Sequence, residues 1–158
     1  MSKTKQDIFI TNNSEETQLL AENFIKKFKK GDVVALYGNL GSGKTTFSQG
    51  LAKGLKINKR IISPTFIIVR KYNLKTSHFA KASRDKQNLK SLYHVDLYRV
   101  ESEKEVRELG IEEIVSGKDI VAIEWAEKMK NLLPEKRWDV KFEDLGGNRR
   151  KIIVNKLT

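Results

Sequence analysis

The chain carries one stretch, Gly38-Asn39-Leu40-Gly41-Ser42-Gly43-Lys44-Thr45, that fits the pattern G-x-x-x-x-G-K-[ST] at every fixed position. Glycines let the backbone wrap closely around phosphate groups, so that successive N–H groups point inward. A helix that begins at this point adds the positive end of its dipole. We expect Lys44 to reach the β- and γ-phosphate oxygens of a nucleotide, and Thr45 to ligate the Mg²⁺ that bridges them.

The residues on both sides favour the strand–loop–helix order that a phosphate-binding loop requires. Asp32 to Tyr37 is a short apolar run, typical of a buried strand. Thr46 to Leu55 repeats apolar residues at helical spacing, namely Phe47, Leu51, Ala52 and Leu55. The alternative is a glycine-rich turn with an incidental lysine, and the flanking pattern disfavours it.

Six further segments are rich in apolar and β-branched residues and predict strands. They are Ile8–Ile10, Phe66–Val69, Leu92–Tyr98, Ile120–Ile123, Trp138–Phe142 and Lys151–Val154. Gly146-Gly147-Asn148 separates the last two and predicts a hairpin turn.

Capping residues predict three further helices. Asn13 or Ser14 offers an N-cap for a helix whose apolar stripe runs to Phe28, and Gly31 ends it. Ser102-Glu103-Lys104-Glu105 matches a capping box, with Gly110 as the stop, and Ile111–Val115 predicts another short helix. Helices that alternate with strands in this way define an α/β protein.

The length of 158 residues predicts one domain, residues 1–158, with a single core. The sequence has no cysteine, which excludes a disulfide, a thiolate zinc site and a cysteine nucleophile. No apolar run approaches the roughly 18 residues of a membrane span, and the first residues lack the apolar segment of a signal peptide. We therefore expect a cytoplasmic protein with no membrane partner.

The formal net charge of +11 favours contact with nucleic acid, acidic proteins or nucleotides. A lysine-rich composition is the other explanation, because the basic residues are scattered and no RNA-binding signature is present. Residues 73–91 are polar and basic and show no clear periodicity. We expect this segment to be a long basic surface loop between two strands.

Phosphate transfer or hydrolysis requires acidic groups for the metal and for the attacking oxygen. In open α/β sheets such groups lie at the carboxyl ends of strands, beside the ligand. Asp96 lies in the strand that begins at Leu92, and Glu124 directly follows the apolar run Ile120–Ile123. Either carboxylate can hold Mg²⁺ while the other orients or deprotonates the nucleophile. A solvated cap at a strand end is the alternative for each.

Three other residues admit two interpretations. His94 shares a strand face with Asp96, and a hydrogen-bonded core histidine is the favoured interpretation. Trp125 either packs near the nucleotide or is buried in the core. Thr65 lies after the first strand–helix unit, where nucleotide switches place a threonine on the metal or γ-phosphate, and a plain loop is equally consistent.

Together these residues resemble a known family, the bacterial tRNA threonylcarbamoyladenosine biosynthesis ATPases, called TsaE or YjeE. The matching stretches occur in the family's order and span most of the chain: Gly38 to Phe47, Ser63-Pro64-Thr65-Phe66, Tyr93 to Arg99, Glu108 to Ile111, and Ile123-Glu124-Trp125. The chain departs from the family at position 39, where Asn replaces the common Asp, and in the longer, more basic segment 73–91.

The resemblance implies a single-domain P-loop NTPase fold with a mixed β-sheet flanked by helices. It implies binding of ATP or ADP, with Mg²⁺ held by Thr45 and Glu124 and with Asp96 beside the metal. Lys44, Asp96 and Glu124 are then the expected catalytic residues. The expected nucleotide contacts are Gly38, Asn39, Leu40, Gly41, Ser42, Gly43, Lys44, Thr45, Thr46, Ser14, Thr17, Thr65, Trp125 and Arg149.

The family acts with two partner proteins that install a threonylcarbamoyl group on the adenosine next to the anticodon of tRNA. The resemblance therefore implies those two partners, an indirect connection to tRNA, and an ATPase that supports their turnover. We expect the basic segment 73–91 to contact an acidic partner or tRNA.

A small-molecule P-loop kinase is the main alternative, and a nucleic-acid-binding protein that uses ATP as a switch is the third. Such kinases carry an arginine-rich lid late in the chain. Here few arginines precede Arg137, and Arg149-Arg150 lies on the predicted hairpin, where the two side chains either touch phosphate or only lie on the surface. With no arginine expected near Asp96 and Glu124, weak hydrolysis alone and a charge supplied by a partner are predicted.

Overall fold

The computed structural model describes residues 5–62, 67–75 and 89–158. Its strands are β1 (Gln6–Thr11), β2 (Val33–Tyr37), β3 (Val69–Asn73), β4 (Ser91–Asp96), β5 (Ile120–Glu124), β6 (Arg137–Gly146) and β7 (Arg149–Leu157). They form one seven-stranded sheet in the order β1-β7-β6-β2-β5-β4-β3. The four central strands β6, β2, β5 and β4 are parallel, whereas β1, β7 and β3 pair antiparallel to their neighbours. The predicted mixed sheet is confirmed.

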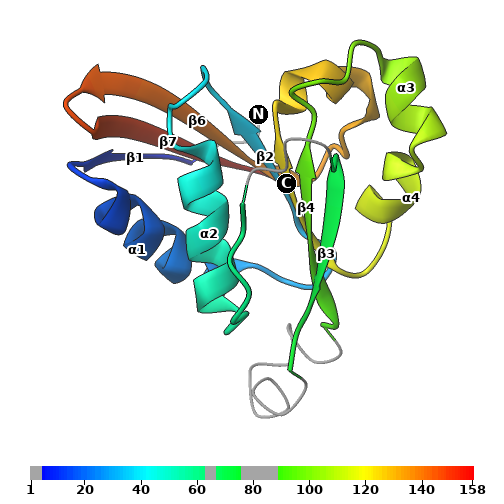
Figure 1. Cartoon of the computed structure of the whole chain (residues 1–158), viewed down its shortest axis with the longest axis horizontal. Helices are drawn as coiled ribbons and strands as arrows, with labels where there is room; N and C mark the ends of the chain where they lie inside the picture. The colour runs from blue at the N-terminus through cyan, green and yellow to red at the C-terminus, as the bar shows by residue number, and fades with distance from the viewer. Residues whose placement is uncertain (1–4, 63–66, 76–88) are drawn as a thin grey trace.

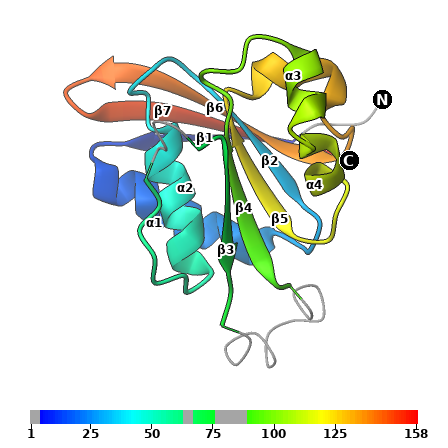
Figure 2. The same cartoon turned by 45° about the vertical axis from the view of Figure 1, so that its right-hand side comes forward.

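Helices cover both faces of this sheet (Figure 1). They are α1 (Ser14–Phe24), the 3₁₀ turn η1 (Ile25–Lys27), α2 (Lys44–Gly54), α3 (Glu103–Glu108), α4 (Ile111–Val115) and the 3₁₀ segment η4 (Ala126–Leu132). Figure 2 shows α1 and α2 on one face, with α3 and α4 on the other. None of the helices in the described ranges is both long and apolar enough to cross a membrane.

The alternation of side chains along the strands divides the core into two clusters. Val34 and Leu36 of β2 pack with α1 and α2, whereas Val33 and Ala35 pack with the residues around α3, α4 and η4. Residues 33–36 of β2 are all apolar because helices bury both faces of this strand. The same parity places Ala122 of β5 on the α2 face, and therefore Glu124 two residues later as well.

The helices α1 and α2 run parallel and approach each other closely through two glycines. A Cβ added at Gly50 would lie 2.3 Å from the carbonyl oxygen of Gln18, and one added at Gly54 would lie 2.2 Å from Cγ2 of Ile25. The C-terminal ends of the two helices therefore lie side by side, at the edge of the molecule opposite the glycine-rich loop (Figure 1).

Several boundaries differ from the sequence prediction. The strand predicted at Leu92–Tyr98 ends at Asp96 as β4, and β1, β6 and β7 extend beyond the predicted ranges at both ends. The strand expected at Phe66–Val69 begins only at Val69, because pairing with β4 starts at Val95, and Phe66 lies outside the described residues. The helix expected to run to Phe28 ends at Phe24 and continues as the turn η1. The helix after the loop begins at Lys44, before the expected Thr46.

The two ends of the basic segment 73–91, residues 73–74 and 89–91, belong to the sheet and its core. Asn73 and Ser91 pair as the end of the β3–β4 ladder, and the N–H of Leu74 donates to the carbonyl of Lys90 at 2.9 Å. Leu74 and Leu89 are buried in the core. The predicted surface loop concerns mainly residues 76–88, which lie outside the described ranges.

A half-buried hydrogen-bonded cluster lies at the end of β2 and changes the titration of one tyrosine. Tyr37 donates its hydroxyl to Oδ1 of Asp139 at 3.2 Å, and Arg137 donates to the same oxygen at 2.7 Å. Burial first, and the Asp139 charge second, raise the pKa of Tyr37 to about 12. The unfolded value is about 10, so the stability from neutral Tyr37 is complete below pH ~10 and is lost as the pH rises toward ~12.

We expect an ultraviolet titration to show a late step near pH 12 that comes from Tyr37. The same titration of Tyr37→Phe should lack that late step, and its stability should change less between pH ~10 and ~12 than that of the unmodified chain. If the late step persists in Tyr37→Phe, the assignment is wrong.

Candidate nucleotide-binding site

The glycine-rich loop connects β2 to α2 with backbone angles that its glycines permit. Gly38 has φ +153°, and a Cβ there would lie 2.5 Å from Oγ of Ser42 and 2.9 Å from the carbonyl oxygen of Phe142. Gly43 has φ +110° and is the N-cap of α2. A Cβ on Gly43 would lie 2.7 Å from Cδ of Arg150. The loop therefore has room for backbone alone at these two points.

Lys44 folds back over its own loop. Its ammonium donates to the carbonyl of Gly38 at 2.5 Å and to the carbonyl of Asn39 at 2.9 Å. It also lies 4.2 Å from the centre of the Trp125 ring, a cation–π contact. Burial lowers the pKa of Lys44, while the charges of Glu124, Glu127 and Asp96 act to raise it. The side chain is only 4% exposed, so its charge is directed at the loop rather than at solvent.

Glu124 receives hydrogen bonds from two different elements. Its Oε2 accepts from the Thr45 hydroxyl at 2.9 Å, and its Oε1 lies 2.7 Å from Nε2 of His94. Ser48 adds a longer contact to Oε1 at 3.5 Å. Glu124 and His94 are both buried. The carboxylate is thus held between α2 and β4, and His94 is the hydrogen-bonded core histidine that the sequence favoured.

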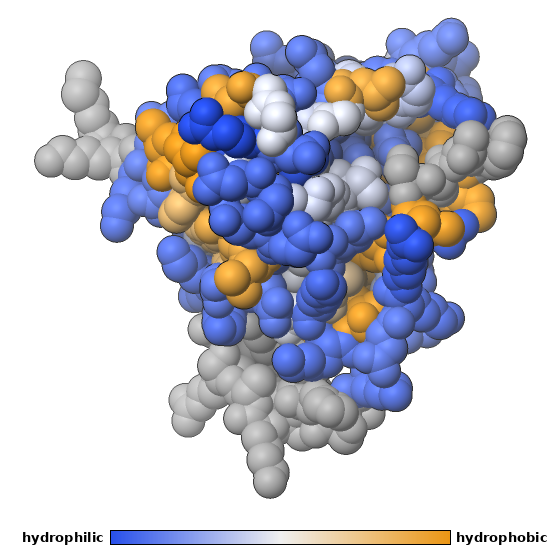
Figure 3. Space-filling view, turned by 60° about the vertical axis from the view of Figure 1, so that its left-hand side comes forward, coloured by the Kyte–Doolittle hydropathy of each residue, from blue (hydrophilic) through white to orange (hydrophobic). Residues whose placement is uncertain are grey.

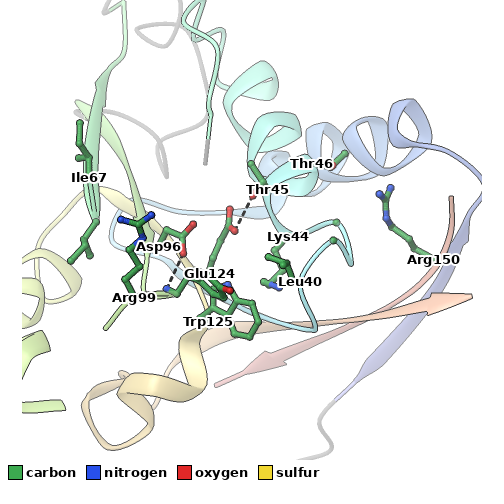
Figure 4. Close-up of a pocket in the computed structure, with 14 residues that line it drawn as sticks. Leu40, Lys44, Thr45, Thr46, Ile67, Asp96, Arg99, Glu124, Trp125 and Arg150 are labelled. Carbon is green, nitrogen blue, oxygen red and sulfur yellow. Dashed lines mark hydrogen bonds between the residues drawn. The ribbon is translucent and has the colours of Figure 1, made fainter. Parts of the chain in front are cut away.

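The second acid lies directly beside the first. Asp96 and Glu124 are partners in the parallel register of β4 and β5, at the carboxyl ends of both strands. Oδ1 of Asp96 accepts from the backbone N–H of Tyr98 at 3.0 Å, and the side chain lies next to Arg99 (Figure 4). Parallel pairing brings the two predicted acids to one edge of the sheet, above the start of α2.

These groups line one cavity of about 540 Å³. The lining comprises Leu40, Gly41, Gly43, Lys44, Thr45, Thr46, Ile67, Ile68, Asp96, Tyr98, Arg99, Glu124, Trp125 and Arg150 (Figure 4). Charged groups form its base, whereas Leu40, Ile67 and Tyr98 form an exposed apolar rim. The volume lies within the range of small-molecule sites, roughly 300–1,000 Å³.

Trp125 closes one side of this cavity with an unusual backbone. It has φ +59°, rare for a residue with a bulky side chain, at the junction of β5 and η4. Its ring lies 5.2 Å from that of Tyr98, and the ammonium of Lys128 donates to the Tyr98 carbonyl. Strained residues of this kind concentrate at functional sites, where the surrounding packing maintains them.

Several expected residues lie elsewhere. Arg149 is exposed and does not line the cavity, whereas its neighbour Arg150 does, with 9% exposure. Ser14 and Thr17 do not line it either; Thr17 is buried and bonds Thr11 at 2.8 Å. Its hydroxyl also accepts from Arg150 at 3.5 Å. Gly38, Asn39 and Ser42 belong to the loop but do not line the cavity, and Thr65 lies outside the described residues.

The expectation that no arginine lies near the two acids is wrong, because Arg99 lies next to Asp96 and lines the cavity (Figure 4). Arg150 also lines the cavity, on the other side of Lys44 from the acids (Figure 4). The alternation of side chains along β7 predicts which face of the sheet Arg150 occupies. Ile152 and Val154 of β7 belong to the core beneath α1 and α2, so Arg150 shares their face. Arg99 carried no such signal, because it follows the end of β4.

A strand, a glycine-rich loop and a helix, with acids at neighbouring strand ends, define the P-loop NTPase fold. The chain belongs to the TsaE family: the family model described as threonylcarbamoyl adenosine biosynthesis protein TsaE matches residues 11–152.

Individual relatives agree with this assignment. The chain is 37% identical to a tRNA threonylcarbamoyladenosine biosynthesis protein TsaE of Bacillus subtilis over 148 residues, which cover 94% of this chain and 84% of the relative. It is 40% identical to the Rickettsia felis protein of the same name over 151 residues, covering 94% and 80%. A crystal structure of Bacillus subtilis YdiB superimposes with a TM-score of 0.74 and 31% identity, covering 100% of this chain and 90% of the other.

The buried contact between His94 and Glu124 should contribute to the free energy of unfolding, which can be measured without any ligand. A double-mutant cycle of His94→Ala, Glu124→Ala and the double variant, followed by denaturant unfolding, should show a coupling free energy of about 1–3 kcal/mol. The exposed pair Lys104 and Glu108, 3.9 Å apart, is the control and should show no resolvable coupling. Additivity at His94 and Glu124 to within about 0.5 kcal/mol would contradict the contact.

Proposed function

We propose that this cavity binds ATP or ADP with Mg²⁺ and hydrolyses ATP. Four functional side chains meet in this one cavity: Lys44 and Thr45 come from the loop, and Asp96 and Glu124 come from two adjacent strand ends. A phosphate loop alone binds nucleotide, whereas acids at this edge add the groups that hydrolysis needs.

The loop is built to receive phosphate oxygens. The backbone N–H groups at the start of α2 point out of the helix, and the helix dipole favours negative charge there. Lys44 uses two of its three N–H donors on the Gly38 and Asn39 carbonyls, which leaves one donor for a phosphate. Arg150, packed against Gly43, adds a second positive charge beside the loop.

Thr45 and Glu124 fit a Mg²⁺ ion. Their oxygens lie 2.9 Å apart at the cavity wall, and Mg²⁺ typically uses one or two protein oxygens together with substrate phosphates. Within the described residues no group of three or more His, Cys, Asp or Glu side chains forms a metal site. When bound, such an ion neutralises charge on the phosphates.

Asp96 has the position of a water-orienting or proton-accepting group. Its carboxylate lies beside Glu124 but is held by the Tyr98 backbone N–H rather than by Thr45. Glu124 and Asp96 therefore have different surroundings, which supports different roles for them. Lys44 and Arg99 supply cations within the same cavity, where they can stabilise charge that develops on the transferred phosphate.

The family assignment supports a biological role. We infer that ATP hydrolysis here serves threonylcarbamoylation of the adenosine next to the tRNA anticodon, in concert with two partner proteins. The exposed apolar rim is open to solvent, with Leu40 73% and Tyr98 50% exposed, so a docked partner would exclude water from the cavity. The segment containing Thr65 remains a predicted switch.

The two adjacent arginines give a matched test of nucleotide binding. Arg150→Ala should weaken ADP binding about tenfold, because it removes a charge-assisted contact beside the phosphate loop. Arg149→Ala, an equal change of charge on an exposed residue, should leave the affinity within about twofold. Isothermal titration calorimetry measures both. Equal effects of the two substitutions would show that Arg150 does not face the nucleotide.

Turnover is predicted to be low for the protein alone and higher with its partners. Steady-state phosphate release should rise by roughly 10³-fold when the two partner proteins are present, the scale of a stabilising charge or closed site supplied in trans. Asp96→Asn should lower this rate while it retains ATP affinity, because Asp96 acts on the attacking oxygen.

Two outcomes would contradict this function. A high basal rate that the partners leave unchanged would remove the cooperative role. Transfer of the γ-phosphate to a small acceptor would favour the kinase alternative.

A further inference from the structure

The end of the molecule opposite the phosphate loop carries a dense group of cations. The C-terminal ends of α1 and α2, with the residues that follow them, contain eight Lys or Arg residues within 22–32 and 53–60, against two carboxylates. We call seven of these the basic helix end: Lys26, Lys27, Lys30, Lys53, Lys56, Lys59 and Arg60. All seven are exposed. The close packing at Gly50 and Gly54 brings the two halves of this surface together.

The contacts of these cations leave their charges uncompensated. Lys26 donates to the amide oxygen of Asn23 at 3.1 Å, Lys53 donates to that of Gln18 at 2.5 Å, and Lys27 lies over the Phe24 ring. Each of these partners is neutral. Across the described ranges, no ion pair joins a carboxylate to any of the seven.

Helix stability does not account for this arrangement. Cations in the last turn of a helix interact favourably with its dipole, and this effect fits Lys53. It decays within one turn, however, and Lys30, Lys59 and Arg60 lie well beyond the ends of α1 and α2. These residues instead raise the local positive potential, at a cost in mutual repulsion.

A second cavity of about 310 Å³ opens within the basic helix end. Ile57 and Ile61 provide apolar lining, and Lys59 and Arg60 lie at the same cavity. Gln18 donates to Gln49 at 2.9 Å, and Gln49 donates to the Ile61 carbonyl at 2.8 Å, which fixes both amides in place. Each amide nitrogen keeps one further N–H for a ligand.

We propose that the basic helix end is an RNA-binding site, in which lysines contact successive phosphates and the cavity receives one unpaired base. An apolar wall, fixed amide donors and a guanidinium together suit a planar base with polar edges. The carboxylates of an acidic peptide would satisfy the charges but have no apolar face to pack against Ile57 and Ile61. The face shown in Figure 3 is largely hydrophilic, with apolar side chains in scattered spots.

This site is separate from the nucleotide cavity. The helix α2 has 11 residues, so about 16 Å lie between its two ends. Gln49 and Lys53 face the RNA site, whereas Lys44 and Thr45 at the other end face the phosphates. RNA binding and nucleotide binding can therefore be altered independently.

The test measures binding of a fluorescein-labelled RNA stem–loop to the full chain by fluorescence anisotropy, at several salt concentrations. Lys56→Ala/Lys59→Ala should weaken binding about tenfold and reduce the slope of log K against log salt by roughly 1–2, because two phosphate contacts are lost. Lys104→Ala/Lys130→Ala removes the same charge from α3 and η4 and should leave the affinity within about twofold. ADP affinity and melting temperature, measured for both variants, should not change.

Three results would overturn the proposal. Equal losses in both double variants would show that net charge alone attracts the RNA. Displacement of the RNA by polyglutamate at lower concentrations than by unlabelled RNA would assign the surface to an acidic protein. Equal affinity for a fully paired duplex and for the stem–loop would remove the role of the cavity.

Discussion

The carboxylate of Glu124 is the group on which the arrangement of the site depends. It lies at the end of β5, accepts from Thr45 at the start of α2, and contacts His94 of β4. Three elements that are distant in sequence are thereby fixed relative to one another around one buried charge. A buried carboxylate is costly unless donors surround it, so the fold maintains these contacts together or loses them together.

This arrangement explains how one edge of the sheet combines binding and chemistry. Parallel pairing places the ends of β2, β5 and β4 side by side, so the loop after β2 meets the acids of the other two strands. Glycines at positions 38 and 43 let Phe142 and Arg150 approach the loop from β6 and β7. The antiparallel half of the sheet therefore contributes to the site as well, through Arg150.

Sequence patterns predicted the local elements of this site because each depends on near neighbours. The glycine spacing, the apolar strand before it and the acids at strand ends all required only periodicity and chain order. The position of Arg150 depends on the pairing of β7 with β6 and β1, and local sequence patterns do not predict which strands pair. The anchoring of Leu74 and Leu89 was likewise missed, because isolated leucines in a basic segment have no periodicity.

If Glu124 and Thr45 hold Mg²⁺ against a nucleotide, then Mg²⁺ and ATP must strengthen each other's binding, and this linkage must depend on Glu124. ATP affinity is measured by calorimetry with and without Mg²⁺, for the unmodified chain and for Glu124→Gln, which keeps the side-chain shape. Mg²⁺ should strengthen ATP binding to the unmodified chain, and this gain should fall about tenfold in Glu124→Gln while the affinity without the metal is retained. An equal gain from Mg²⁺ in both proteins would contradict it.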